Sequence, residues 1–127
     1  MIDLSISDVL TRAADLLDKK GACRGANARL EGGKACGVFD QRAASFSLYG
    51  ALCAVLGPGL GDDKALQASP AWKLIALRAW ALIPQDVQAG SRLEYALHDL
   101  NEHTKSPALF FRDLAGDAEI KALGTWR

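Results

Sequence analysis

A stretch without a single charged side chain, residues 43–61, constrains the fold more than any other feature of this sequence. Its length is close to that of a membrane-spanning helix. However, two serines and a glycine-rich end confine the continuous apolar part to residues 48–56. If this part forms a helix, all of its faces are apolar. Such a helix must lie inside the protein. We therefore expect a buried central helix over residues 40–56, with Asp40 as its N-cap.

Five further helices are expected, because 22 alanines and 19 leucines far outnumber the 12 Val, Ile and Thr residues that favour strands. Apolar residues recur at helical spacing in these segments, and Ser5, Ser69, Ser91 and Ser106 precede four of them as N-caps. The expected helices cover residues 6–20, 70–83, 92 to about 101–104, 107–116 and 118–123.

A glycine-rich segment separates the first expected helix from the central one. Residues 21–37 contain five glycines and show no long apolar period, which is typical of a connecting segment. Connections of this length are uncommon unless they are functional. We therefore expect an all-α fold: a single compact bundle of five or six short helices, with this long connecting segment, forming one domain over residues 1–127. A short hairpin near residues 35–39 is the alternative left open.

The charge balance and the cysteines exclude several classes of protein. Fifteen basic and fifteen acidic side chains give no net charge, so nucleic-acid binding is not expected. No secretory signal or membrane span is visible, and we expect a cytoplasmic protein. The three cysteines form no C-x-x-C pair, which disfavours a zinc site. Reduced thiols are the simplest interpretation, and a Cys23–Cys36 bridge is the alternative.

Several short motifs occur in a familiar order along the chain. They are Gly25-Ala26-Asn27-Ala28-Arg29, Gly32-Gly33, Ser47-Leu48-Tyr49-Gly50-Ala51-Leu52, and Leu100-Asn101-Glu102 with Thr104. Over about residues 9–114 the chain resembles a family of small phage and bacterial proteins of unknown function, which has G-x-x-A-R-like, G-A-L-like and W-N-D-like motifs. Ser47, Leu100 and Glu102 stand where this family leads us to expect Cys, Trp and Asp. The resemblance implies a phage or mobile-element context rather than a chemistry.

The resemblance singles out Arg29, Asn101 and Glu102 as a polar cluster. The Arg29 guanidinium can pair with the Glu102 carboxylate, while Asn101 ties down loop amides, because buried charges need partners. One interpretation is structural. The other is that the cluster, together with His103, forms the floor of a pocket that recognises a ligand or a partner.

On the helix near residue 100, residues four apart form two pairs of potential metal ligands. These pairs are Asp99 with His103 and His98 with Glu102. On a helical projection the first pair flanks the apolar stripe and the second points towards solvent. A zinc site needs a third protein ligand, so we expect no metal site. Cys23 lies among basic residues that would activate a thiol. No nucleophile elbow or phosphate-binding loop is present, and we expect no catalytic residues and no cofactor.

The charges are distributed unevenly along the chain. Residues 19–42 hold six basic side chains against two acidic ones, whereas residues 94–119 hold six acidic against two basic. Either the two regions attract each other within the fold, or they dock on a charged partner. Three aromatic side chains do not lie on the apolar faces of the expected helices, and they form either a second layer of the core or anchors of an interface. These are Trp80, Tyr95 and Trp126.

Two hypotheses about function follow. The leading one is a non-enzymatic protein-interaction module of phage or mobile-element origin, such as an inhibitor of a host defence or regulatory protein. It would dock on a host or phage protein through Lys20, Arg24 and Lys34, and a homodimer is the other form of partnership considered. The alternative is a small ligand-binding or metal-binding protein, or an enzyme, whose pocket lies around the cluster of Arg29, Asn101, Glu102 and His103.

Overall fold

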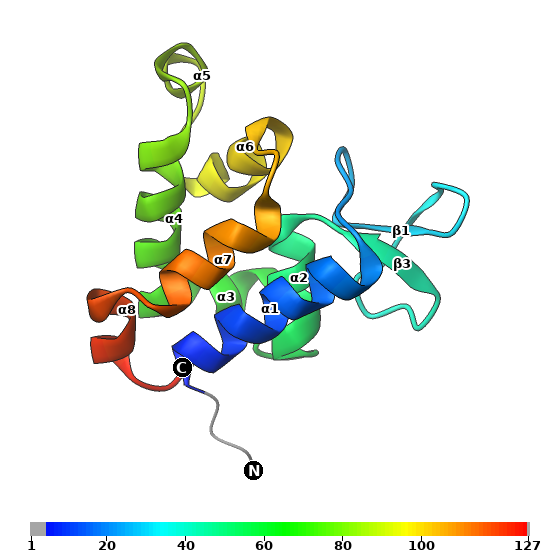
Figure 1. Ribbon diagram of the computed structural model, residues 1–127, viewed down its shortest axis with the longest axis horizontal. Coiled ribbons are helices and arrows are strands. Elements are labelled where there is room, and N and C mark those ends of the chain that lie inside the picture. Colours follow the sequence, from blue (N-terminus) through cyan, green and yellow to red (C-terminus); the bar gives the residue numbers. More distant parts are fainter. Residues whose placement is uncertain (1–4, 127) are drawn as a thin grey trace.

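The computed structural model of the chain describes residues 5–126 and places most of them in helices around a central apolar helix, α2 (Figure 1). The helices are α1 (Ile6–Lys20), α2 (Leu48–Leu56), α3 (Asp63–Ala68), α4 (Pro70–Leu82), α5 (Gln85–Ala89), the 3-10 turn η1 (Leu93–Tyr95), α6 (Ala96–His103), α7 (Pro107–Ala115) and α8 (Ala118–Leu123).

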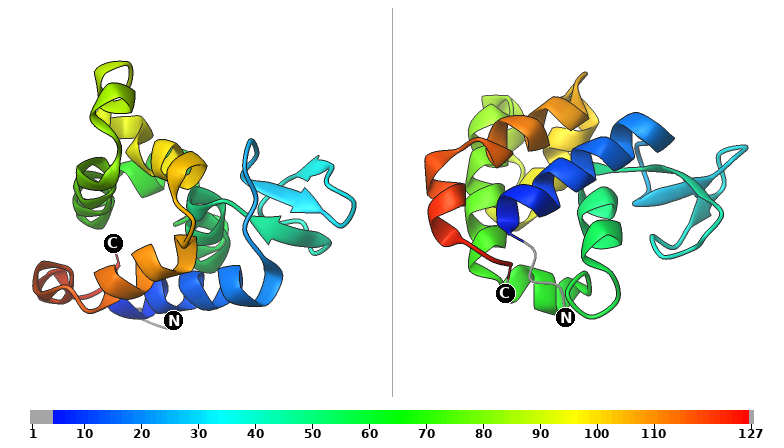
Figure 2. Two further views of the ribbon diagram at one scale, coloured as in Figure 1. Left: turned by 45° about the horizontal axis from the view of Figure 1, so that its top comes forward. Right: turned by 60° about the horizontal axis from the view of Figure 1, so that its bottom comes forward.

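The predicted all-α fold is wrong, because the chain also forms a three-stranded antiparallel sheet. Its strands are β1 (Ala28–Leu30), β2 (Ala35–Cys36) and β3 (Ala43–Phe46), in the order β2-β1-β3. In both views of Figure 2 the sheet projects from one side of the helical part. The segment predicted to be a glycine-rich connection, residues 21–37, therefore contains two of the three strands.

A tight glycine turn explains the hairpin between β1 and β2. Gly32 and Gly33 both have φ of +99°, a backbone conformation that residues with a side chain rarely adopt. Next to them, Leu30 N donates to Lys34 O at 2.7 Å, which closes the turn. This hairpin begins earlier in the chain than the one considered near residues 35–39.

The central helix is confirmed, but it begins later than predicted. Residues 43–46 form β3, and α2 starts at Leu48 with Ser47 as its N-cap; the Ser47 Oγ accepts from Gly50 N at 2.9 Å. Asp40 caps no helix, because its carboxylate accepts instead from the backbone and guanidinium of Arg42. Helix α2 is buried along most of its length, as its apolar surface requires.

The other predicted helices differ from the structure mainly at their ends. Helix α1 has the predicted bounds, and its cap Ser5 accepts from Asp8 N at 3.0 Å. The short helices α3 and α5 were not predicted. The capping box predicted at Ser91 does not form: its hydroxyl donates to the Asp99 carboxylate, and a 3-10 turn precedes α6.

The last residues close the core against the first helix. Helix α1 packs along α7 and α2, and α8 adds the fully buried Ile120. Ile6 N donates to Gly124 O at 2.8 Å, and Ser5 pairs with Thr125 in an isolated β-bridge. Trp126 is buried and belongs to the core. Within residues 5–126, no helix has both the length and the apolar character needed to cross a membrane.

Candidate functional site

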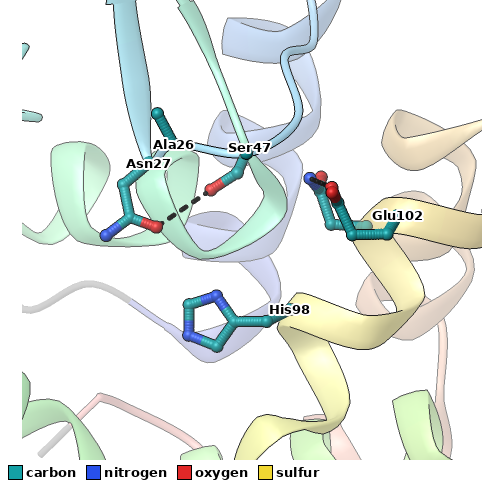
Figure 3. A pocket seen from close by; sticks show the side chains of 7 residues that line it. Ala26, Asn27, Ser47, His98 and Glu102 are labelled. Carbon is teal, nitrogen blue, oxygen red and sulfur yellow. Dashed lines mark hydrogen bonds between the residues drawn. The ribbon is translucent and has the colours of Figure 1, made fainter. Parts of the chain in front are cut away.

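A pocket of about 400 Å³ lies where three distant segments of the chain meet. The loop after α1 supplies one wall, the start of α2 a second, and one face of α6 the third (Figure 3). Its lining residues are Gly25, Ala26, Asn27, Ser47, His98, Asn101 and Glu102.

Asn101 connects all three segments. Its side chain is only 6% exposed. The Oδ1 accepts from Leu48 N, at the start of α2, at 2.9 Å. The Nδ2 donates to Cys23 O, in the loop, at 3.0 Å and to Glu102 Oε2 at 3.3 Å. The carboxamide is therefore fully occupied in holding the pocket walls together, and it also orients the neighbouring carboxylate.

Ser47 and Asn27 form the side of the pocket opposite α6. Ser47 N donates to Asn27 O at 3.0 Å, and the Ser47 hydroxyl donates to Asn27 Oδ1 at 3.4 Å (Figure 3). Gly50 makes this approach possible, since a Cβ built on it would lie 1.9 Å from the Asn27 carbonyl oxygen. The loop therefore lies directly on the first turn of α2.

His98 reaches from α6 towards Asn27 and Ser47 (Figure 3). On its other side the ring contacts the ring of Tyr49, with centroids 4.8 Å apart. The Tyr49 hydroxyl in turn donates to the carboxylate of Asp63. Burial lowers the pKa of His98, and this effect exceeds the opposing attraction of the Asp99, Asp63 and Glu102 carboxylates. The imidazole is therefore neutral at pH 7.

The structure separates the predicted polar cluster into two groups. Asn101 and Glu102 lie together at the pocket, and in the loop Asn101 binds the Cys23 carbonyl rather than the backbone amides that the sequence suggested. Arg29 does not pair with Glu102. Its guanidinium donates to the carbonyl oxygens of Arg24 and Gly33, at 2.8 Å each, and so braces the glycine-rich loop and the hairpin turn.

His103 lies outside the pocket, and His98 occupies the position expected for it. His103 is exposed, and its Nδ1 lies 2.8 Å from the backbone oxygen of Asp99. The Asp99 carboxylate accepts a hydrogen bond from the Ser91 hydroxyl, so Asp99 and His103 do not form a pair of metal ligands. His98 and Glu102 do line the pocket together. Among residues 5–126, no group of three His, Cys, Asp or Glu side chains is arranged to hold a metal ion.

The predicted docking residues Lys20, Arg24 and Lys34 are all exposed. Arg24 also has an internal role, because its Nη2 donates to Thr104 O, just after α6, at 2.9 Å. This bond links the basic segment to the acidic one through a backbone carbonyl. Within residues 5–126, no ion pair joins a basic side chain of residues 19–42 to an acidic one of residues 94–119.

The three cysteines are free thiols. Burial raises the pKa of Cys23, although the Ser45 hydroxyl and the positive charge of Arg29 oppose this effect. Burial and the nearby Asp63 carboxylate raise the pKa of Cys53 to about 12. Both side chains are therefore protonated near neutral pH, and neither has the lowered pKa that marks a reactive thiol.

Two signals in the sequence pointed to the pocket residues that were not predicted. His98, Asn101 and Glu102 follow the i, i+3, i+4 spacing of a single helix face. Three of the four segments that carried the family resemblance also supply Asn27, Ser47 and Asn101, one from each. A comparison with family models now confirms that resemblance: residues 1–114 match a family described as of unknown function, DUF6197. The chain belongs to this family. No curated protein and no solved structure matches the chain.

Proposed function

We propose that the protein binds a small polar molecule in the pocket between the 23–27 loop, the start of α2 and α6. The observation that carries this proposal is the convergence of Asn27, Ser47, His98 and Glu102, which come from three segments of the chain, on one open space. Protein pockets that bind small molecules have volumes of roughly 300–1,000 Å³ and a few convergent polar groups. At about 400 Å³, this pocket is at the small end of that range.

The rigid construction of the pocket supports the same proposal. Asn101 fixes the loop and the helix start relative to α6, and the close contact at Gly50 leaves the loop little freedom. A preformed site loses little conformational entropy when a ligand binds. The side chains of His98 and Glu102 remain available to a ligand, since each has at least one polar atom without a protein partner among residues 5–126.

The test is a screen of small polar metabolites by thermal denaturation of the wild-type protein, followed by titration calorimetry of each hit. Two variants remove pocket groups, Glu102→Ala and His98→Ala. The matched control is His103→Ala, which removes an exposed side chain from the end of the same helix. We expect hits that stabilise the wild type and the control but neither pocket variant. Hits that stabilise all four proteins equally, or no hits at all, would contradict the proposal.

A protein-interaction role is the second candidate, and two exposed leucines of α4 favour it. Leu77 is 43% exposed and Leu82, the last residue of the helix, is 62% exposed. Lys20 and Lys34 are exposed as well and would add steering by charge. A phage or mobile-element origin and a cytoplasmic location belong to this second proposal.

This second candidate is tested by affinity purification of the tagged protein from its native source, with quantitative mass spectrometry. The variant Leu77→Asp/Leu82→Asp replaces both exposed leucines of α4 with charged side chains. Leu123→Asp is the matched control, because Leu123 is comparably exposed but lies on α8. We expect a stoichiometric partner that is lost from the α4 variant and retained by the control. A partner retained by both variants would exclude these two leucines as the docking site.

A further inference from the structure

The charge inside the pocket indicates which kind of ligand it takes. Glu102 is the one charged side chain among the seven lining residues at neutral pH. Its Oε2 accepts from the Asn101 amide, but no ion pair within residues 5–126 involves its carboxylate. Among residues 5–126 the pocket therefore carries one carboxylate without an ion-pair partner, and the nearby Arg29 guanidinium, beside Gly25, is bonded to backbone carbonyls instead.

His98 adds an acceptor without adding a positive charge. Because the neutral form is favoured, the imidazole offers one nitrogen as a hydrogen-bond acceptor. The groups that influence the charge of His98 are the carboxylates of Asp63 on α3 and of Asp99 and Glu102 on α6; the Tyr49 hydroxyl is already bonded to Asp63. No cationic side chain is among them.

The remaining polar groups of the pocket are mostly used within the protein. The Asn101 carboxamide is occupied on both atoms, and the Ser47 hydroxyl both accepts from Gly50 N and donates to Asn27. The Asn27 Nδ2 is the donor left for a ligand. The free positions are thus a carboxylate and an imidazole acceptor on α6, with one neutral donor facing them.

We propose that the pocket binds a small molecule through a protonated nitrogen, an ammonium or a guanidinium, held between Glu102 and His98. A carboxylate forms its strongest hydrogen bonds with a charged donor, so the Glu102 carboxylate, which is exposed at the pocket, favours a cationic group of the ligand. The Asn27 amide donates to an oxygen on the uncharged part of the ligand. This inference rests on the proposed ligand-binding function and specifies the chemical class of the ligand.

The test uses probes matched in shape and different in charge, titrated into the ¹⁵N-labelled protein at pH 7.5. One set is putrescine, 1,4-butanediol and succinate; the other is benzamidine, benzamide and benzoate. We expect the two cations to shift the amide signals of residues 25–27, 47–48 and 98–102 saturably, and to bind about tenfold more tightly than the matched neutral probes.

Variants separate the pocket from general attraction to acidic side chains. Glu102→Gln keeps an acceptor for Asn101 but removes the charge, so binding of the cations should fall about tenfold to the level of the neutral probes. Glu94→Gln removes an exposed carboxylate just before the same helix and should leave binding unchanged. Lowering the pH through the pKa of His98 should weaken binding to the wild type, because the protonated ring no longer accepts a hydrogen bond, and should have less effect on His98→Gln.

The outcomes distinguish this inference from the proposed function on which it rests. If benzamide, butanediol or the anions bind in the pocket as tightly as the cations, the pocket binds ligands but the inferred ligand class is wrong. If the cations shift carboxylate-bearing segments throughout the protein equally, the inferred class is again wrong. If no probe and no metabolite from the screen shifts the pocket signals, both the inference and the proposed function are contradicted.

Discussion

Asn101 holds together parts of the chain that are far apart in sequence, using a single carboxamide. It satisfies Leu48 N, which begins α2 and has no partner within that helix, and it satisfies Cys23 O in the loop. Without this side chain, the buried Leu48 N and the partly buried Cys23 O would lose their partner. The same side chain also lies beside Glu102. The geometry of the pocket therefore depends on a residue with no free hydrogen-bonding group of its own.

Replacing Asn101 with alanine should lower the free energy of unfolding by about 2–4 kcal/mol, because a buried donor and a partly buried acceptor lose their partner together. Urea denaturation followed by circular dichroism measures this loss. The control is His103→Ala, an exposed change on the same helix that should alter stability by less than about 0.5 kcal/mol. Equal effects from the two variants would show that the Asn101 hydrogen bonds contribute little.

His98 should make stability depend on pH below neutrality. Its pKa in the folded protein is lower than its ordinary value, so the folded state favours the neutral ring. The stability that comes from keeping the ring neutral is fully present above about pH 6.5, the ordinary pKa of histidine. It is lost as the pH falls through the pKa of His98 in the folded protein. Between pH 7 and pH 5 the unfolding free energy of the wild type should therefore fall more than that of His98→Gln, as measured by urea titration. Parallel curves for the two proteins would contradict the lowered pKa.

The choice between the two histidines marks the limit of sequence analysis at this site. Asn101 and Glu102, which the resemblance selected, both line the pocket. The helical projection placed His103 beside the apolar stripe and His98 towards solvent, whereas in the structure His98 is half-buried at the pocket and His103 is exposed. The 23–27 loop and the start of α2 pack against the His98 side, and these long-range contacts decide which histidine lines the pocket.

At the scale of elements, most of the longer helices were predictable, whereas the sheet and the short helices α3 and α5 were not. Helix α1 has fifteen residues and a clear apolar stripe, so its bounds follow from the pattern and the caps. The strands have three, two and four residues, too few for an alternating pattern to appear. Their pairing also joins β1 to β3 across the intervening hairpin, and such long-range contacts are not encoded in any single window of sequence.

Gly50 provides a test of how closely the loop packs on α2. In an isolated helix, alanine in place of glycine stabilises by about 1 kcal/mol. Here the new Cβ would lie 1.9 Å from the Asn27 carbonyl oxygen, so Gly50→Ala should instead destabilise by about 3 kcal/mol or more. Gly116→Ala is the control, because its Cβ would make only an ordinary contact at 3.7 Å. A stabilising effect at Gly50, read from thermal denaturation, would mean that the loop does not contact α2 this closely.

Over the whole molecule, the fold extends beyond the part that matches the family. The match ends at residue 114, whereas α8 and the residues after it complete the core. Ile120 is fully buried, and Trp126 is buried near α1. The first helix also depends on this segment, because Ile6 N donates to Gly124 O.

Ile120→Ala should therefore lower the free energy of unfolding by about 2–4 kcal/mol, as expected for a large core side chain replaced by alanine. Guanidinium denaturation monitored by tryptophan fluorescence measures the change. The neighbouring exposed substitution Lys121→Ala should change stability by less than about 0.5 kcal/mol. A loss below about 1 kcal/mol for Ile120→Ala would show that the last helix contributes little to the core.

The β-bridge between Ser5 and Thr125 places the two ends of the described chain next to each other (Figure 1). Circular permutation is therefore feasible: a short linker can join residue 126 to residue 5, and new ends can be opened at the Gly32–Gly33 turn. Such a permutant should fold with nearly the same far-ultraviolet circular dichroism spectrum as the parent. It would carry its new ends at the exposed hairpin tip, where a reporter protein could be attached without covering the junction of α1 and α8.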